Sequence, residues 1–211
     1  MIRWLDHRAR ELFAAAGLDT LERLCACTRG EVVSRARTRI CRRLVLAGRG
    51  YFLKSQVVPP PALPLRRWPS YLLRGSPLVR EARNLGRLTR LGVAVPPLVC
   101  TGSSRRWWGL PHRAVLITSA LADHVDLARL AAADPERAAA AAAVAEELAA
   151  GLHRRGWVLG GLKYRNILVD RTGGIALIDL PDLRRSFLGK GRRRDRRILA
   201  RERVRAFPSR S

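Results

Sequence analysis

The chain contains 211 residues, and 47% of them are hydrophobic, which is enough for the core of one ordinary domain or of two small lobes. Its formal net charge of +24 and its pI near 11.7 favour polyanionic partners, namely phosphorylated glycolipid, anionic membrane or nucleic acid. The alternative is a compositional excess of arginine with no single target. The sequence has no stretch of about 18 apolar residues and no signal peptide, so we expect a cytoplasmic protein.

The first third of the chain predicts a helical segment followed by strands. Residues 1–27 are expected to be helical, with Leu5, Leu12 and Phe13 facing inward and a break at residues 17–19. Residues 28–57 predict three strands, the last of which ends on Lys54. The proline-rich run at residues 59–69 predicts a stiff loop without regular structure.

A helix is predicted over residues 76–92, because Ser-Pro opens this segment and a glycine closes it. Glu81, Leu85 and Leu88 fall at i, i+4 and i+7 and therefore share one helical face. A carboxylate on an apolar face needs a cation, and Lys54 is its natural partner. Taken singly, each of these two residues is more simply explained as a solvated surface charge.

Two further strands, near residues 98–101 and 114–119, and a long helix over residues 134–153 precede a predicted β-hairpin. The hairpin pairs residues 166–169 with residues 175–178 across a Gly-rich turn. Antiparallel pairing would bring Asn166 and Asp179 to the same end of this hairpin. Amide and carboxylate oxygens at one point suit Mg²⁺, which also takes oxygens from nucleotide phosphates. The alternative is a surface hairpin with incidental polar ends.

The loop before the hairpin departs from the kinase pattern His-x-Asp-Leu-x-x-x-Asn. With the register fixed on Asn166, Leu159 stands where histidine belongs and Gly161 stands where the catalytic aspartate belongs. General-base assistance by that aspartate contributes roughly 10²–10⁴ in rate. Asp182, three residues after Asp179, is the carboxylate that could substitute for it.

These segments together resemble the lipopolysaccharide kinase (Kdo/WaaP) family. The similarity rests on Tyr51-Phe-Leu-Lys54, on residues 80–96 and on Leu177-Ile-Asp-Leu180, and it extends over residues 28–205. Residues 35–39 also look like the family's arginine-rich first hairpin, which stands in for a Gly-rich phosphate loop. The resemblance implies ATP- and magnesium-dependent phosphorylation of heptose or Kdo in the lipopolysaccharide inner core. Lys54 and Glu81 would then bind the nucleotide, and Asn166 and Asp179 would bind the metal.

The sequence also departs from the family at positions other than Gly161. Pro181 follows Asp179-Leu180 in a segment that is ordinarily adaptable. Ile198 stands where the family has a polar residue before leucine, so we expect the last helix to lack its polar link to the catalytic loop. Loss of this link and of the loop aspartate is what relaxed selection for catalysis would produce.

The rival functional class is nucleic-acid binding, through the basic cluster at residues 190–197. No zinc finger or helix-turn-helix spacing accompanies this cluster, so we rank the class below the kinase interpretation. The cysteines are expected to be reduced thiols that bind no zinc, because they lack the spacing of a zinc site: Cys25, Cys27, Cys41 and Cys100.

We therefore predict an α+β, two-lobed protein-kinase-like fold with a small C-terminal lobe. The expected parts are an N-terminal helical extension (residues 1–27), an N-lobe that clamps nucleotide (28–120) and a reduced C-lobe with a basic tail (121–211). The expected function is an impaired, lipopolysaccharide-kinase-like phosphotransferase. The alternative is a pseudokinase that binds nucleotide or anionic glycolipid as a regulator. The expected partners are lipopolysaccharide core or another anionic glycolipid, at the inner face of the inner membrane.

Overall fold

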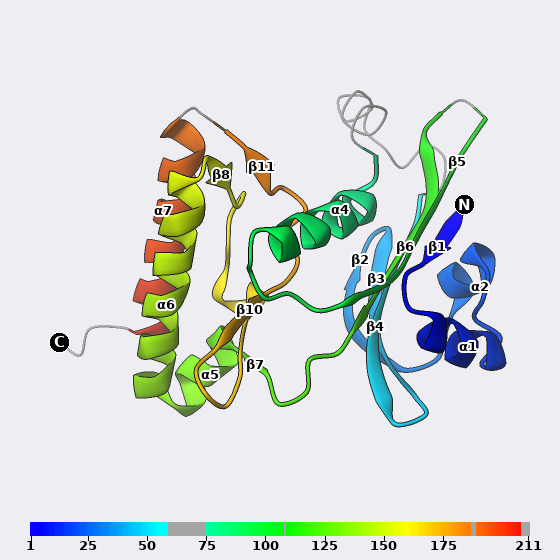
Figure 1. Ribbon diagram of the computed structural model, residues 1–211, viewed down its shortest axis with the longest axis horizontal. Coiled ribbons are helices and arrows are strands. Elements are labelled where there is room, and N and C mark those ends of the chain that lie inside the picture. The colour runs from blue at the N-terminus through cyan, green and yellow to red at the C-terminus, as the bar shows by residue number, and fades with distance from the viewer. Residues whose placement is uncertain (59–74, 108, 187–188, 208–211) are drawn as a thin grey trace. The chain divides into compact units, whose positions relative to one another are not determined.

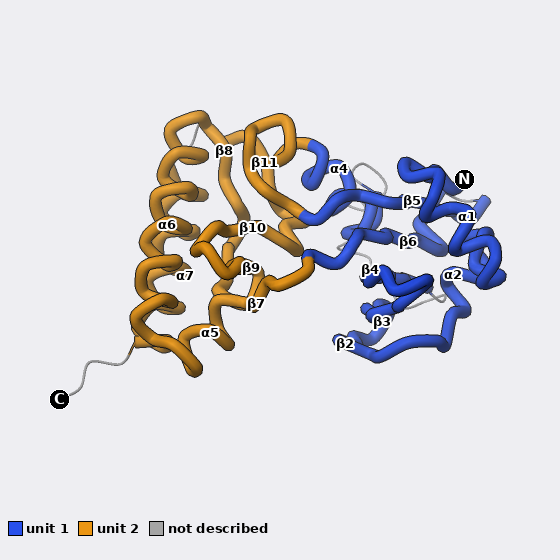
Figure 2. Tube along the Cα trace, turned by 60° about the horizontal axis from the view of Figure 1, so that its bottom comes forward, with its two compact units in different colours: residues 1–86, 96–121 blue, residues 87–95, 122–211 orange. Residues whose placement is uncertain are grey.

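The computed structural model describes residues 1–58, 75–107, 109–186 and 189–207. The chain forms two compact units, one of residues 1–86 and 96–121 and one of residues 87–95 and 122–211, which Figure 2 colours separately. The predicted loop at residues 59–69 lies outside the described residues. The architecture is mixed α+β with antiparallel sheets, as the sequence predicted.

Unit 1 is built on a six-stranded antiparallel sheet in the order β1-β5-β6-β4-β3-β2 (Figure 1). Its strands are β1 (Ile2–Trp4), β2 (Glu31–Ala36), β3 (Arg39–Leu46), β4 (Arg49–Val57), β5 (Leu98–Arg105) and β6 (Pro111–Ser119). The three strands predicted between residues 28 and 57 are confirmed as β2, β3 and β4. The prediction that the third strand ends on Lys54 is wrong, because β4 continues to Val57 as it pairs with both β3 and β6.

Two short helices, α1 (His7–Ala15) and α2 (Leu21–Ala26), cover one face of this sheet (Figure 1). Phe13 is fully buried and meets the ring of Tyr51 edge-on, with centroids 5.2 Å apart. The predicted break between the helices is confirmed. The prediction of an all-helical segment is wrong at its start, since β1 pairs with β5, and this strand leaves Leu5 46% exposed rather than inward-facing.

Helix α4 (Pro77–Arg90) confirms the helix predicted from its start and stop signals. The Ser76 hydroxyl accepts a hydrogen bond from the Val79 N–H at 3.3 Å, which satisfies one of the free donors of the first turn. At the other end Gly92 has φ +78°, and the Val93 N–H donates to the Leu88 carbonyl at 3.0 Å. The boundary between the units falls inside this helix, after Gly86.

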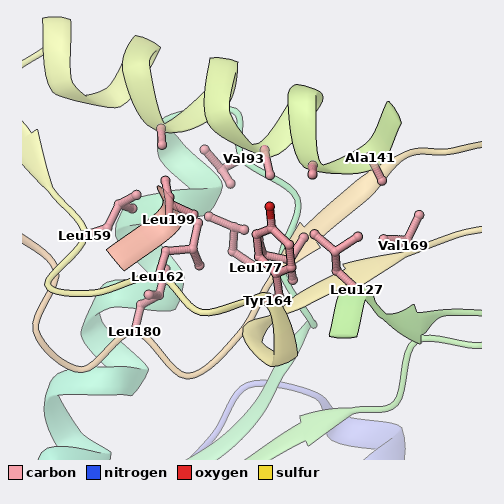
Figure 3. Packing of buried hydrophobic residues seen from close by; sticks show 14 of the residues in the cluster. Val93, Leu127, Ala141, Leu159, Leu162, Tyr164, Val169, Leu177, Leu180 and Leu199 are labelled. Atoms are coloured by element: carbon pink, nitrogen blue, oxygen red, sulfur yellow. The ribbon is translucent and has the colours of Figure 1, made fainter. Parts of the chain in front are cut away.

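Unit 2 combines helices with two small antiparallel sheets, ordered β10-β9-β7 and β11-β8. Its elements are β7 (Val125–Asp126), α5 (Leu127–Ala133), α6 (Pro135–Arg154), β8 (Trp157–Val158), a 3-10 turn (Tyr164–Asn166), β9 (Ile167–Val169), β10 (Ile175–Leu177), β11 (Arg184–Arg185) and α7 (Gly189–Ala206). Buried side chains from most of these elements form one core, including Leu127, Leu162, Tyr164 and Leu199 (Figure 3). The predicted long helix and hairpin are thus confirmed as α6 and β9–β10.

The turn of the β9–β10 hairpin is held by one side chain. The Asp170 carboxylate accepts hydrogen bonds from the Thr172 N–H at 2.8 Å, the Thr172 hydroxyl at 2.7 Å and the Gly174 N–H at 2.9 Å. The hydroxyl hydrogen bond, together with the two backbone donors, lowers the pKa of Asp170. Three donors on one carboxylate fix the hairpin register, and with it the positions of the residues that flank the two strands.

Within the described ranges, none of the helices combines the length and the apolar character needed to cross a bilayer.

Candidate functional site

One candidate group of functional residues is an ion pair inside unit 1. The Lys54 Nζ lies 2.6 Å from the Glu81 Oε1, and the Glu81 side chain is only 4% exposed while that of Lys54 is 23% exposed. Glu81 shares its helical face with Leu85 and Leu88, which are also buried. The pair predicted from helical periodicity is therefore present. It fixes the lysine ammonium group, because a carboxylate at this depth needs a cationic partner.

Strand alternation explains why Lys54 points toward α4. Successive side chains of β4 point to opposite faces of the sheet. Leu53 lies in the hydrophobic core that includes Phe13 of α1, so Lys54 projects from the other face. Figure 1 shows α1 and α2 on one side of the unit 1 sheet and α4 on the other.

A second candidate group lies at the open end of the hairpin in unit 2. The Ile178 N–H donates to the Asn166 carbonyl at 3.0 Å, directly beyond the paired residues Ile167 and Leu177. Asn166 and Asp179 therefore flank the same end of the hairpin, as predicted. Asn166 is 8% exposed.

Asp179 has an unusual backbone. Its φ is +56°, in the left-handed region that few residues other than glycine adopt. Aspartate tolerates this region better than most residues, but the conformation still has a cost and is typical of functional sites. Pro181, two residues later, does not prevent Asp179 from adopting this conformation.

Asn166 and Asp179 suit a magnesium ion by their chemistry. They offer one amide oxygen and one carboxylate, the hard donors that Mg²⁺ prefers. Across the part of the chain that the structure describes, no cluster of three or more His, Cys, Asp or Glu side chains forms a closed metal cage. Mg²⁺ bound by one or two protein groups, with phosphates and water completing its shell, matches this limited donor set. Lys54 and Glu81 belong to unit 1, and Asn166 and Asp179 belong to unit 2.

The loop before the hairpin contains two glycines in conformations that other residues rarely adopt. Gly160 has φ +80° and Gly161 has φ +112°. A Cβ atom on Gly161 would lie 3.0 Å from the Ile198 Cδ1, and one on Gly160 would lie 2.5 Å from the Asp182 Cβ. Gly161, which stands in the place of the aspartate, is thus constrained both by its backbone and by the helix behind it.

Asp182 lies beside this loop. The close approach to Gly160 involves the Asp182 Cβ, carbonyl carbon and carbonyl oxygen. The chain then runs antiparallel to the loop's start, since Arg184 pairs with Val158 and Arg185 pairs with Trp157. The Asp182 side chain is exposed.

Asp195 of α7 is a site residue that sequence reasoning missed. It is completely buried, and its Oδ2 accepts a hydrogen bond from the Leu159 N–H at 2.7 Å and lies 3.1 Å from the His153 Nε2. In the sequence, Asp195 interrupts the basic cluster at residues 190–197. The available signal was its spacing, because Asp195, Leu199 and Glu202 fall at i, i+4 and i+7.

The expectation that the last helix has lost its polar link to the catalytic loop is therefore wrong. Asp195 makes that link from a position three residues before Ile198. Glu202 adds a second one, because its Oε2 accepts a hydrogen bond from the Tyr164 N–H at 3.1 Å. Helix α7 thus holds both ends of the loop at residues 159–164.

A model described as "Lipopolysaccharide kinase (Kdo/WaaP) family" matches residues 67–205, more than half of the chain. A comparison with curated proteins finds no match.

Two solved structures of WbdD are among those similar to this chain. A high-resolution (2.2 Å) crystal structure of WbdD has 17% identity and a TM-score of 0.49, and the match covers 71% of this chain and 31% of that chain. A co-crystal structure of WbdD and the kinase inhibitor LY294002 has the same identity and TM-score, with 72% and 32% covered. This chain therefore spans about a third of the length of the solved structures that it matches.

Proposed function

We propose, from the premise that this chain belongs to the lipopolysaccharide kinase (Kdo/WaaP) family, that it is a slow ATP-dependent phosphotransferase acting on a heptose or Kdo sugar of the lipopolysaccharide inner core. The proposed architecture is a two-lobed protein-kinase-like fold, with unit 1 as the nucleotide clamp and unit 2 as the reduced C-lobe. The observation that carries the proposal is the Lys54–Glu81 ion pair at 2.6 Å. A pair of this kind, between a strand lysine and a helix glutamate, is the feature that holds nucleotide phosphates in kinases.

In this proposal the four polar residues have separate tasks. The Lys54 ammonium group binds phosphate oxygens of ATP, and Glu81 keeps that group in place. Asn166 and Asp179 hold Mg²⁺, which when bound neutralises charge on the phosphates. The buried environment of Glu81 and the left-handed backbone of Asp179 support these roles, because both features have an energetic cost that a binding site would explain.

The transfer itself moves the terminal phosphoryl group of ATP to a sugar hydroxyl, whose proton must leave. Gly161 provides no acceptor for that proton. We propose that the exposed Asp182 carboxylate, beside Gly160, accepts it. Asp182 lies outside the position where the family has its base. A well-placed base raises the rate roughly 10²–10⁴-fold, so we expect this protein to lose part of that factor and to turn over more slowly than a family member with the aspartate.

A second candidate is favoured by the conformation of Gly161. With φ +112° and Ile198 close by, this position is adapted to glycine and does not simply lack a side chain. A protein with an intact nucleotide site and a loop fixed in this form would act as a pseudokinase, which binds nucleotide or an anionic glycolipid and regulates a partner.

The experiment that separates the two candidates measures binding and turnover on the same purified protein. Calorimetric titration of ATP with and without magnesium tests the nucleotide site, using Asp179→Ala as the variant that removes a proposed metal ligand. Single-turnover γ-phosphate transfer to a lipopolysaccharide-core acceptor then tests catalysis. Binding with transfer supports the enzyme, and binding without transfer supports the pseudokinase. Failure of the folded wild-type protein to bind ATP would contradict both.

The basic surface supports a location at the inner face of the inner membrane. The exposed side of α7 carries Arg193, Arg194, Arg197 and Arg201, while its other side holds the buried Asp195. Arginines near an anionic bilayer surface contribute about 1 kcal/mol each. A peripheral position would bring the protein to its glycolipid substrate, whereas nucleic acid is the less favoured partner because no base-reading motif accompanies the arginines.

A further inference from the structure

A cavity of about 500 Å³ lies in unit 1 beside the turn that joins β2 to β3. Its lining contains none of Lys54, Glu81, Asn166 and Asp179, but it includes residues 35–39, the segment that resembles the family's arginine-rich phosphate hairpin. The lining residues that matter here are Cys25, Arg35, Arg37, Ile40, Ser55 and Val57.

The register of the sheet shows that this cavity opens on the face opposite Lys54. Arg35 pairs with Ile40 on β3, and Ile40 pairs with Ser55 on β4, so the three side chains form one row on one face. Lys54 is the neighbour of Ser55 in β4 and pairs with Cys41, so both of these lie on the other face. The row that contains Arg35 is on the side covered by α2, whose Cys25 also lines the cavity.

The cavity carries positive charge that no carboxylate of the described residues neutralises. Arg35 and Arg37 are exposed. Within the described ranges, neither guanidinium group has a carboxylate partner within 4.0 Å. Burial raises the pKa of the Cys25 thiol to about 11, so this side chain is neutral near pH 7 and adds no opposing charge. The floor combines the hydroxyl of Ser55 with the apolar side chains of Ile40 and Val57.

We propose that this cavity is a second anion site, which binds a phosphate monoester on the face of the sheet away from the nucleotide. The guanidinium groups of Arg35 and Arg37 hold the phosphate oxygens, because their planar donor geometry matches a phosphate. The Ser55 hydroxyl donates a further hydrogen bond, and Ile40 and Val57 contact the organic part of the ligand. The ligand is either a soluble phosphorylated molecule or the head group of a lipid such as phosphatidic acid.

Two cysteines on opposite faces of the sheet provide the test. Alkylation of the full-length protein by N-ethylmaleimide, followed by peptide mass spectrometry, reports the rates at Cys25 and Cys41 separately. Saturating phenyl phosphate is expected to slow alkylation of Cys25 about fivefold to tenfold while Cys41 reacts as before. Vesicles containing phosphatidic acid, compared with phosphatidylcholine vesicles, form the second arm. Protection by phenyl phosphate identifies a soluble ligand, and protection by phosphatidic acid vesicles alone identifies a lipid head group.

Matched variants separate a built site from general charge attraction. Arg35→Ala is expected to weaken protection about tenfold in ligand concentration, the loss typical of one charge-assisted contact to phosphate. Arg49→Ala removes the same charge from an exposed position at the start of β4, outside the cavity, and is expected to leave protection unchanged. Equal weakening by the two variants, equal slowing at both thiols, or no protection by either probe would overturn the proposal. Because the readout uses no ATP, these outcomes are independent of the nucleotide site.

Discussion

The Asp195 carboxylate accepts a hydrogen bond from the Leu159 N–H at 2.7 Å, across a sequence separation of 36 residues. This bond joins helix α7 to the start of the loop that contains Gly161. The same Asp195 oxygen lies 3.1 Å from the His153 Nε2, so the last turn of α6 meets the loop and α7 at one buried point. A buried carboxylate with two such partners is costly to alter, because its loss leaves both partners unsatisfied.

Replacing Asp195 with alanine is expected to destabilise unit 2 by about 3 kcal/mol, the magnitude of breaking a buried hydrogen-bonded charge. The Leu159 amide should also lose its protection from hydrogen exchange. Chemical denaturation and amide exchange measure the two effects. Arg194→Ala, which changes an exposed neighbour on the same helix, serves as the control and should change stability by less than about 0.5 kcal/mol. Unchanged exchange at Leu159 in Asp195→Ala would contradict the link.

The Lys54–Glu81 pair predicts a non-additive pair of substitutions. Lys54→Met leaves the Glu81 carboxylate, 4% exposed, without its cation and should cost about 3 kcal/mol. Removing both charges, as in Lys54→Met with Glu81→Met, should recover much of this loss because no charge is left buried. Denaturation measures the free energy of unfolding of each variant. Calorimetry should show that Lys54→Met and the double variant each bind ATP at least tenfold more weakly than the wild-type protein. If the double variant loses as much free energy of unfolding as Lys54→Met and Glu81→Met lose separately when added together, the two side chains are not coupled.

Restoring the family's aspartate is expected to require two changes. Gly161→Asp alone places a side chain on a backbone with φ +112° and brings its Cβ within 3.0 Å of the Ile198 Cδ1, so it should destabilise the protein by about 1–3 kcal/mol. Adding Ile198→Ala removes the close contact and should return part of that loss. Thermal melts of the single and double variants measure this. Single-turnover phosphoryl transfer then shows whether the recovered double variant is faster than wild type, and a Gly161→Asp variant as stable as wild type would show that the loop backbone can change.

Asp182→Asn tests the proposed proton acceptor. The amide keeps the shape of the side chain but cannot accept the hydroxyl proton, so the rate of phosphoryl transfer should fall by roughly 10²-fold while ATP affinity stays constant. Asp123→Asn, an exposed aspartate in the same unit, is the matched control. Equal rates for wild type and Asp182→Asn would remove Asp182 from the mechanism.

The outer face of α7 predicts salt-sensitive binding to anionic membranes. Sedimentation with vesicles that contain anionic lipid should decrease steeply between about 0.05 M and 0.5 M salt, because the attraction is screened within a Debye length. Replacing Arg193, Arg194 and Arg197 together with glutamine should weaken binding to anionic vesicles by roughly 3 kcal/mol in total at low salt. Three exposed arginines of unit 1 changed in the same way, Arg3, Arg49 and Arg105, control for net charge. Equal sedimentation with neutral and anionic vesicles would argue against an electrostatic role.

The sequence by itself determined the parts of the site that depend on local patterns. The Glu81 helix could be predicted because its periodicity, its serine start and its glycine stop all lie within one short segment. The hairpin between Asn166 and Asp179 could be predicted because its turn is fixed by residues adjacent to the strands. The need of Glu81 for a cation then identified Lys54, since an unpaired carboxylate on an apolar face is unstable in any fold.

Only the tertiary structure decided the features that depend on distant partners. Ile2–Trp4 is a strand because β5, about a hundred residues later in the chain, offers it an edge to pair with, and no local signal encodes that edge. Asp195 is a buried link and not part of a solvated basic cluster, because the Leu159 N–H and His153 meet it from other elements. The backbone of Gly161 is likewise set by what surrounds it, since glycine tolerates almost any φ and its sequence position alone selects none.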